Sequence, residues 1–417
     1  MAEVKGFRGY RFDPEVAGPW DNLVTPPYDV INPEQRAILA TKSPHNMVHV
    51  ILPQDQGGKD RYEVAASTFE DWIAKGVLKQ DAEESLYLLE QTFRSKDGAE
   101  RVRRGFFAVT KVPEPGESIV LGHERTFSGP VEDRLKLTAS TRANLGPVFV
   151  LYTDPEHALA PFLARMDERP PDAVAHTIDG ATSRLWRVPA DPRVSAFLAD
   201  KRLYIADGHH RFKTACFYRD QMRAQEKPTG PRAYDYVLMG FVPFDDAGLL
   251  ICPPHRVVQQ PEGFDLAALL DGLGRWFEVS TVEGDLAAAT EQGAGCRIGM
   301  AVAGGKQYLL ALRPGDRSDF LGSDHSAAWR NLDVAVLHRG ILEKVMGFSE
   351  GAQHEYEHDA AKALAAVADG KAGLAFLLPP MHPGQVQACA EASDPMPQKS
   401  TYFFPKLPTG AVIHRLV

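Results

Sequence analysis

The sequence predicts an α+β fold built from many short strands and several amphipathic helices. Apolar runs of strand length recur along the chain, and the longest covers residues 236–242. Between them lie segments whose apolar residues repeat at helical spacing. The 35 glycines and 31 prolines are spread over all 417 residues, which predicts frequent turns between these elements.

Composition and charge narrow the class of protein. The chain is 44% hydrophobic and 24% charged, which is typical of a soluble globular protein and leaves room for two to four domains. Its net charge of -9 argues against a basic surface for nucleic acid, so we expect no appreciable binding of duplex DNA. No apolar run is long enough to span a bilayer, and the first residues lack the apolar segment of a signal peptide. A cytoplasmic protein without a membrane partner is expected.

Four cysteines occur without a C-x-x-C pair, so neither a zinc ribbon nor a redox pair is expected. Cys216, Cys252, Cys296 and Cys389 are predicted to be reduced and at least partly buried thiols.

Residues 1–115 are expected to form an N-terminal α/β region. Asn32 before Pro33 predicts a helix start, because asparagine caps a helix and proline fits its first turn. Asp97-Gly98 predicts a hairpin turn between two β-rich runs. Apolar spacing predicts the remaining elements, which are strands at 47–53, 85–93 and 104–112 and a helix at 62–75.

Residues 116–262 form the second expected region, and 202–225 is its most informative segment. A strand at 203–206 runs into a turn at Asp207-Gly208, and a helix follows from about His209. Neighbouring segments predict strands within 118–126, 147–152, 235–244 and 248–258, a helix at 131–145, and a hairpin turning at Asp179-Gly180.

The third expected region, 263–417, contains a string that matches the zinc-protease pattern H-E-x-x-H, from His354 to His358. Asp359 is a good cap for the helix that follows, so the two histidines are expected in extended chain about 13 Å apart, too far to share zinc. The other expected elements are helices at 264–277 and 332–346 and strands at 296–303, 306–313 and 374–379.

The strongest candidate for chemistry is the turn Asp207-Gly208-His209-His210-Arg211. A glycine between a strand and a helix lets a phosphate approach the first N–H groups of the helix. Arg211 could grip phosphate oxygens, and Asp207 could hold Mg²⁺ or accept a proton. In the alternative interpretation, Asp207 only caps the helix and the histidines are surface residues.

Other polar residues are weaker candidates. Glu124 follows a predicted strand, and strand ends in α/β folds often carry functional side chains. Arg142 and Lys399 could bind a second phosphate or a carboxylate, although Lys399 also fits a solvated turn. Tyr28 and Asp29 either line a site or shape a rigid turn.

The motifs YIADGHHR, TPPYDVI, GHERT, TRANLGPVF, PPHRVV, LDVAVLH and MPQKSTYFFPK resemble the bacterial family catalogued as domain of unknown function 1015. The resemblance covers essentially the whole chain. The DGHHR turn is also similar to that of the archaeal ADP-dependent free serine kinase, in the ParB-like and sulfiredoxin-like superfamily. This implies a ParB-like core at 116–262 whose turn binds nucleotide phosphates. Sulfiredoxins have a cysteine where this chain has His209, so sulfiredoxin chemistry is not expected.

These observations predict a small-molecule phosphotransferase that moves phosphate from a nucleotide or pyrophosphate to serine or a similar hydroxyl compound. Phosphoryl transfer needs a phosphate cradle, cations and a group that orients or deprotonates the acceptor. Gly208 and Arg211 would form the cradle, and His209 and His210 would donate to the developing charge. Asp207 would hold Mg²⁺ or accept a proton, and Glu124 would be the base. A nucleotide-binding regulator without catalysis and a ParB-like nucleic-acid-associated protein are the alternatives.

Overall fold

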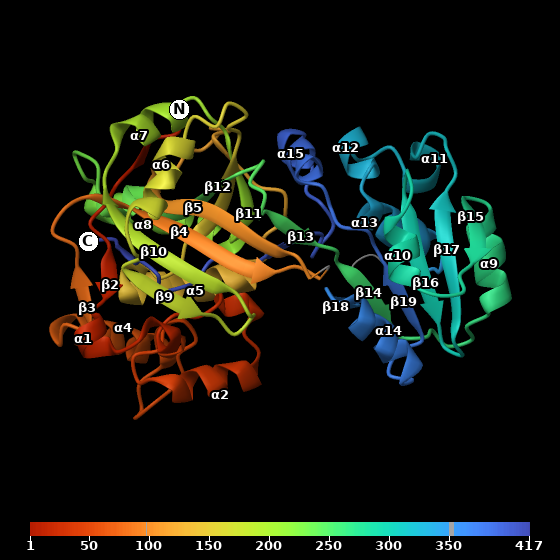
Figure 1. The fold of residues 1–417 in the computed structure, drawn as a ribbon, viewed down its shortest axis with the longest axis horizontal. Helices are drawn as coiled ribbons and strands as arrows, with labels where there is room; N and C mark the ends of the chain where they lie inside the picture. The colour runs from red at the N-terminus through yellow and green to blue at the C-terminus, as the bar shows by residue number, and fades with distance from the viewer. Residues whose placement is uncertain (97, 350–353) are drawn as a thin grey trace. The chain divides into compact units, whose positions relative to one another are not determined.

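The computed structural model describes residues 1–96, 98–349 and 354–417 and has the predicted α+β class (Figure 1). The chain forms two compact units. Unit 1 consists of residues 1–122, 126–250 and 405–417, and unit 2 of residues 123–125 and 251–404. The boundary expected near residue 115 therefore falls inside unit 1, because strands from both sides of it join one sheet.

Unit 1 is built on a nine-stranded mixed sheet with the order β6-β11-β8-β12-β5-β4-β10-β9, and β1 pairs with β5. The strands are β1 (Val4–Lys5), β4 (Ser85–Arg94), β5 (Glu100–Lys111), β6 (Val120–Leu121), β8 (Val148–Tyr152), β9 (Ala173–His176), β10 (Thr182–Pro189), β11 (Leu203–Asp207) and β12 (Tyr236–Pro243). Two short pairs lie apart from it, β2 (Tyr10–Phe12) with β3 (Leu78–Gln80) and β7 (Ala143–Asn144) with β21 (His414–Arg415).

Both predicted hairpins are present. Strands β4 and β5 pair antiparallel up to Arg94 and Glu100, although Asp97 of the predicted turn lies outside the described residues. Strands β9 and β10 pair antiparallel around Asp179-Gly180, with Gly180 in the left-handed region at φ 86°.

The helices of unit 1 are α1 (Pro14–Ala17), α2 (Pro33–Lys42), α3 (Val48–Ile51), α4 (Arg61–Ala74), α5 (Ser128–Thr141), α6 (Ala160–Leu163), α7 (Pro192–Leu198) and α8 (His209–Glu226). Helix α2 begins as predicted, with a capping box from Asn32. The strand predicted at 47–53 is wrong. The Asn46 side chain accepts a hydrogen bond from the N–H of Val48 and starts the helical turn α3, whose apolar residues are buried on more than one side.

The core of unit 1 fixes the elements around the candidate site. Apolar side chains of β5, β8, β11 and β12 pack together with α7 and the inner side of α8. Helices α5 and α8 also pack against each other. The start of α8 is therefore held between the sheet and a second helix.

Unit 2 contains a six-stranded sheet with the order β15-β17-β16-β19-β14-β18. Its strands are β14 (His255–Val258), β15 (Phe277–Thr281), β16 (Arg297–Val302), β17 (Lys306–Leu312), β18 (Glu355–Glu357) and β19 (Leu374–Leu377), while β13 (Leu250–Cys252) pairs with β20 (Tyr402–Phe404). The helices are α9 (Leu266–Gly274), α10 (Leu286–Glu291), α11 (Ser318–Leu321), α12 (Ala327–Arg330), α13 (Asp333–Ala335), α14 (Ala360–Ala368) and α15 (Pro383–Glu391). The helix predicted at 332–346 is formed by α13 and a π-helical segment, Val336–Val345.

The H-E-x-x-H string of unit 2 adopts the predicted extended conformation. Its middle residues form β18, and the Asp359 side chain accepts hydrogen bonds from the backbone N–H groups of Ala361 and Lys362 at the start of α14. The absence of zinc at His354 and His358 stays a prediction.

The four cysteines are unpaired, as predicted, and all but the half-buried Cys216 are fully buried. In the part of the chain that the structure describes, no helix combines the length and apolarity required to cross a membrane.

Candidate functional site

The site centres on the turn between β11 and α8, which forms as predicted. Strand β11 ends at Asp207, Gly208 caps the helix with φ 94°, and α8 begins at His209. A residue with a side chain rarely adopts this left-handed conformation. A Cβ on Gly208 would also lie 2.9 Å from Nε and Nη2 of Arg211, so the glycine makes room for the guanidinium group.

Asp207 is bound by two cations. Lys406 Nζ lies 2.6 Å from Oδ1 of Asp207, and Arg211 Nη2 lies 2.5 Å from Oδ2. All three side chains are largely buried. Burial by itself would raise the pKa of Asp207, but Lys406 and Arg211 hold the pKa of this carboxyl well below its usual value. Arg211 also donates to the carbonyl of Pro147, so its orientation is fixed on two sides.

The cluster of Asp207, Arg211 and Lys406 carries a net positive charge. With Lys406 and Arg211 in their ordinary ionised forms, it contains two cationic side chains and one carboxylate. The neighbouring His209 adds no charge at neutral pH, because burial lowers its pKa to about 3. A buried excess of positive charge at the N-terminal end of an 18-residue helix favours an anion, since the helix dipole has the same sign there.

Sequence reasoning missed Lys406. It lies 199 residues from Asp207, in the C-terminal segment that returns to unit 1. Nothing in its local sequence indicates an ion pair, and the lysine singled out in that part of the chain was Lys399. Only the folded arrangement identifies Lys406 as part of the site.

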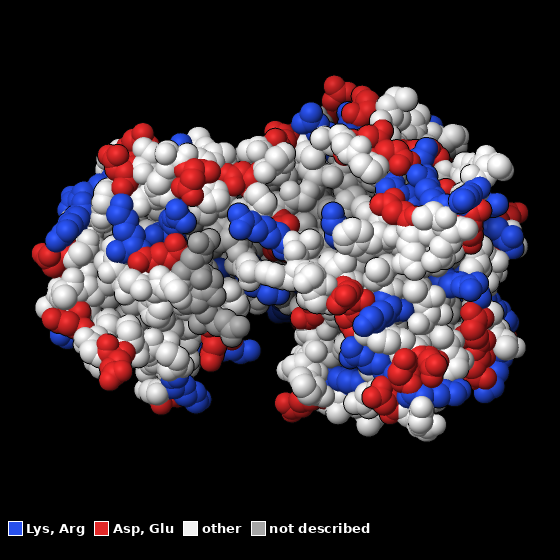
Figure 2. Space-filling view, turned by 180° about the vertical axis from the view of Figure 1, so that it is seen from behind, with Lys and Arg blue, Asp and Glu red and all other residues white. Residues whose placement is uncertain are grey.

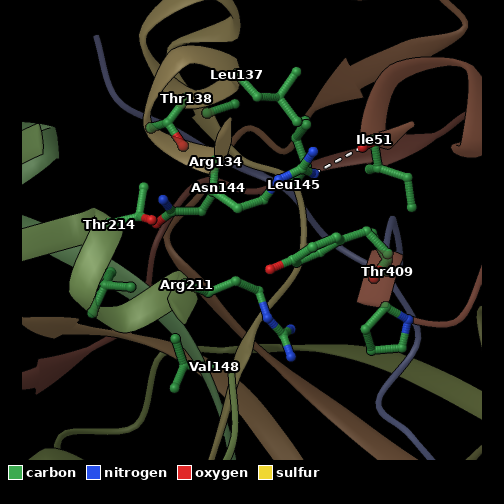
Figure 3. A pocket seen from close by; sticks show the side chains of 15 residues that line it. Ile51, Arg134, Leu137, Thr138, Asn144, Leu145, Val148, Arg211, Thr214 and Thr409 are labelled. Atoms are coloured by element: carbon green, nitrogen blue, oxygen red, sulfur yellow. Dashed lines mark hydrogen bonds between the residues drawn. The ribbon is translucent and has the colours of Figure 1, made fainter. Parts of the chain in front are cut away.

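A small cavity of about 60 Å³ lies beside Arg211 (Figure 3). Figure 3 shows Arg134 from α5 and Arg211 from α8 lining this cavity together with Asn144 and the hydroxyl-bearing Thr138 and Thr409. By volume, the cavity accommodates a few waters or a group of similar size rather than a whole nucleotide. It is therefore suited to one end of a ligand whose remainder lies outside.

Tyr28 lines the same cavity, as one of the two interpretations of its segment predicted. The guanidinium carbon of Arg134 lies 4.1 Å from the centre of the Tyr28 ring. Burial raises the pKa of Tyr28 to about 12, so its hydroxyl is protonated and can donate at neutral pH. Arg134 is itself bound to Asp133 and to the carbonyl of Ile51, which fixes its position at the cavity wall.

The other predicted residues lie elsewhere. The Nε2 atom of His210 accepts a hydrogen bond from the backbone N–H of Phe127, and the two rings stack with centroids 6.3 Å apart. Arg142 is exposed at the C-terminal end of α5, in the left-handed conformation with φ 48°. Glu124 and Lys399 belong to unit 2. Their participation with the turn of unit 1 stays a prediction.

Asp207 does not fit the predicted role of a magnesium ligand in this arrangement. Both of its oxygens already accept from cationic side chains, and the charges of Lys406 and Arg211 would repel a metal ion bound to the same carboxylate. Within the described residues, no group of three or more histidines, cysteines or carboxylates is arranged to hold a metal ion. Lys406 and Arg211 are therefore the cations that this site itself provides.

Comparison with known proteins identifies the family. The family model described as "Protein of unknown function (DUF1015)" matches residues 4–335. The chain belongs to the DUF1015 family. No curated protein matches this DUF1015 member significantly.

Several solved structures show a distant likeness to this DUF1015 chain. A free serine kinase in complex with AMP is 12% identical, with a TM-score of 0.35 over 71% of this chain and 86% of that one. A conserved hypothetical protein from Pyrococcus furiosus is 12% identical, with a TM-score of 0.34 over 73% and 93% of the two chains. SbnI with a C-terminal truncation, from Staphylococcus aureus, is 12% identical with a TM-score of 0.35 over 73% and 85%. Similarity at this level does not assign an activity.

Proposed function

We propose that unit 1 binds the phosphates of a nucleotide or of pyrophosphate beside the Gly208 turn, and that the protein is a small-molecule phosphotransferase. The observation that carries this proposal is the buried cluster of Asp207, Arg211 and Lys406, whose net charge is positive at the start of α8. A phosphate carries the negative charge that two cationic side chains at a helix start attract. The adjoining cavity would hold one end of the donor or the acceptor.

Each residue has a role in this proposal. In this proposal the phosphate lies near the first N–H groups of α8, where Gly208 has no side chain, and Arg211 donates to its oxygens. Asp207 holds Arg211 in place, and Tyr28 and Arg134 supply donors from the cavity wall. The acceptor is a small hydroxyl compound such as serine, with Glu124 as its base. The proposal includes a ParB-like core at 116–262.

A nucleotide-binding regulator remains the second candidate, because the anion site lies in unit 1 whereas the proposed base, Glu124, lies in unit 2. Binding without catalysis requires only the anion site of unit 1. A nucleic-acid partner is less favoured, since acidic and basic side chains are interspersed on the face of the molecule in Figure 2.

Arg211→Ala is expected to weaken binding of pyrophosphate and of ADP by about 10- to 100-fold, the scale of one lost charge-assisted hydrogen bond. Calorimetric titration measures this effect. Lys213→Ala is the control, because Lys213 is an exposed cation on the same helix, and its loss should change the affinity less than about threefold. Unchanged affinity in Arg211→Ala would show that the turn is only an ordinary helix start and does not bind phosphate.

Glu124→Gln is expected to retain phosphate affinity and to lose most turnover, because a base contributes about 10²- to 10⁴-fold to the rate. Purified protein is incubated with ADP, ATP or pyrophosphate and a panel of hydroxylated metabolites, and phosphorylated products are detected by mass spectrometry. Glu262→Gln, an exposed carboxylate of the same unit, is the matched control. Binding by the wild type without any product would favour the regulator over the enzyme.

A further inference from the structure

The cavity beside Arg211 is lined by cationic and neutral polar side chains. Arg134 and Arg211 supply the cations, and the other polar side chains of the lining are Tyr28, Thr138, Asn144, Thr214 and Thr409. None of the described residues that line it is an aspartate, a glutamate or a histidine. A charged ligand group in this cavity would therefore meet positive side chains and no acidic one.

Arg134 has donors left for a ligand. A guanidinium group carries two N–H donors on each terminal nitrogen. Nε and Nη2 of Arg134 donate to Asp133, and Nη1 donates to the carbonyl of Ile51, so one N–H stays on each terminal nitrogen. Asp133 also accepts from Nη2 of Arg61 at 2.9 Å, so two cations share this carboxylate. In Figure 3 the guanidinium groups of Arg134 and Arg211 lie above and below the middle of the view.

Two neutral side chains of the cavity wall add further donors. The Tyr28 hydroxyl has no hydrogen-bond partner within the described residues. The positive charges of Arg134 and Arg211 both act on it, although burial raises its pKa overall. Asn144 accepts the backbone N–H of Leu238 through Oδ1 at 3.0 Å, which leaves its Nδ2 as a donor. The wall therefore offers donors from four side chains.

These donors suit a ligand that supplies acceptors. A carboxylate only accepts hydrogen bonds and a hydroxyl both donates and accepts, whereas an ammonium group only donates. An ammonium group in this cavity would face two guanidinium groups without an acidic side chain to compensate it, and burial of an unpaired charge is costly. The cavity thus favours a carboxylate or a hydroxyl and disfavours an amine.

Volume and apolar residues limit the ligand group to a short carbon chain. One water needs about 10–15 Å³, so a cavity of about 60 Å³ holds about four to six groups of that size. Leu137, Leu145 and Val148 supply the apolar part of the wall. We propose that this cavity binds the acceptor of the phosphoryl group, and that the acceptor is a small hydroxy acid whose carboxylate is held by Arg134 and Tyr28. This inference rests on the proposed function and narrows its acceptor to a compound with a carboxylate and without an amino group.

The test is calorimetric titration of the full chain with glycerate, serine and glycerol, with and without saturating pyrophosphate. Glycerate should bind at least about 10-fold more tightly than serine, in which an ammonium group replaces one hydroxyl, and than glycerol, which lacks the carboxylate. Serine that binds as tightly as glycerate would overturn the exclusion of an amine. Glycerol that binds as tightly as glycerate would overturn the carboxylate site.

Tyr28→Phe tests the binding residues without disturbing the fold, because the hydroxyl that it removes has no partner within the described residues. It should weaken glycerate binding about 10-fold and leave pyrophosphate binding within about threefold of the wild type. The control is Tyr10→Phe, since Tyr10 is not part of the lining. An equal loss for pyrophosphate would mean that Tyr28 faces the phosphate, and unchanged glycerate binding would remove it from the site. Either outcome overturns its role.

Arg134→Gln should weaken glycerate binding about 30-fold or more, because it removes the charge that pairs with the carboxylate. Its control is Lys136→Gln, an exposed cation of the same helix, which should stay within about threefold of the wild type. Wild-type affinity for glycerate in Arg134→Gln would place the carboxylate elsewhere and overturn the proposal. If Arg134→Gln does not fold, Tyr28→Phe decides alone.

The outcomes separate this inference from the proposed function. If the wild type binds pyrophosphate but none of the three compounds under either condition, the phosphate site stands and the acceptor site falls. If it binds glycerate but neither pyrophosphate nor ADP, the phosphotransferase falls and the cavity is a carboxylate site of another kind. If it binds none of these ligands, both fall.

Discussion

Asp207→Asn is expected to lower the free energy of unfolding of the protein by about 3–5 kcal/mol, because it leaves Lys406 and Arg211 buried without their shared carboxylate. Thermal unfolding monitored by circular dichroism measures the loss. The control is Asp71→Asn, which breaks an exposed pair with Lys75 and should cost less than about 1 kcal/mol. The pKa of Asp207 is lowered in the folded state, so the wild-type advantage is present above about pH 4 and fades as the pH falls further.

Pyrophosphate should restore the stability of Asp207→Asn. Asp207→Asn keeps an amide oxygen that can accept a hydrogen bond from Arg211, whereas the negative charge that repels a phosphate is removed, so the affinity for the anion should increase rather than fall. A ligand at 100 times its Kd adds about 2.7 kcal/mol to the free energy of unfolding, which melting curves with and without pyrophosphate resolve. If Asp207 held magnesium instead, Asp207→Asn would bind more weakly than the wild type in the presence of Mg²⁺ and equally well in chelator.

The parts of the site that could be predicted are those whose signals are local. An apolar strand, Asp207-Gly208 and a polar helix start lie within one short segment, and the structure forms them in that order. Tyr28 could be identified only as one of two alternatives, because Pro26 and Pro27 indicate a rigid segment without indicating what it faces. The structure places its side chain at the cavity beside Arg211.

The place of Lys406 could not be predicted, nor could the hydrogen bonds from Gln91 and Arg103 to its segment of the chain. These contacts depend on pairings between distant strands. Gln91 and Arg103 face each other only through the β4-β5 hairpin, and both reach a segment more than 300 residues further along the chain.

The wrong prediction of a strand at 47–53 has a different origin. Alternating apolar residues suggested a strand, but the Asn46 side chain binds the backbone two residues later and starts a helical turn.

Gly208→Val is expected to abolish measurable pyrophosphate binding, a loss of at least about 100-fold, while most of the fold is retained. The added side chain would stand where the proposal puts the phosphate, beside the first N–H groups of α8. Its Cβ would also meet the Arg211 guanidinium group at 2.9 Å and push it away from Asp207. Both effects act on the same donors, so the affinity should fall further than in Arg211→Ala.

The matched control is Gly116→Val, because Gly116 has nearly the same conformation, φ 92°, with no atom close to the position of a Cβ. Placing a β-branched residue in the left-handed region costs about 1–2 kcal/mol in either position, so both variants should melt below the wild type. Gly208→Val should melt lower than Gly116→Val, because it also displaces Arg211 from Asp207. Only Gly208→Val should lose pyrophosphate binding in calorimetric titration. Equal binding by the two variants would show that the space above Gly208 serves the packing of Arg211 alone, and the phosphate site would have to lie elsewhere.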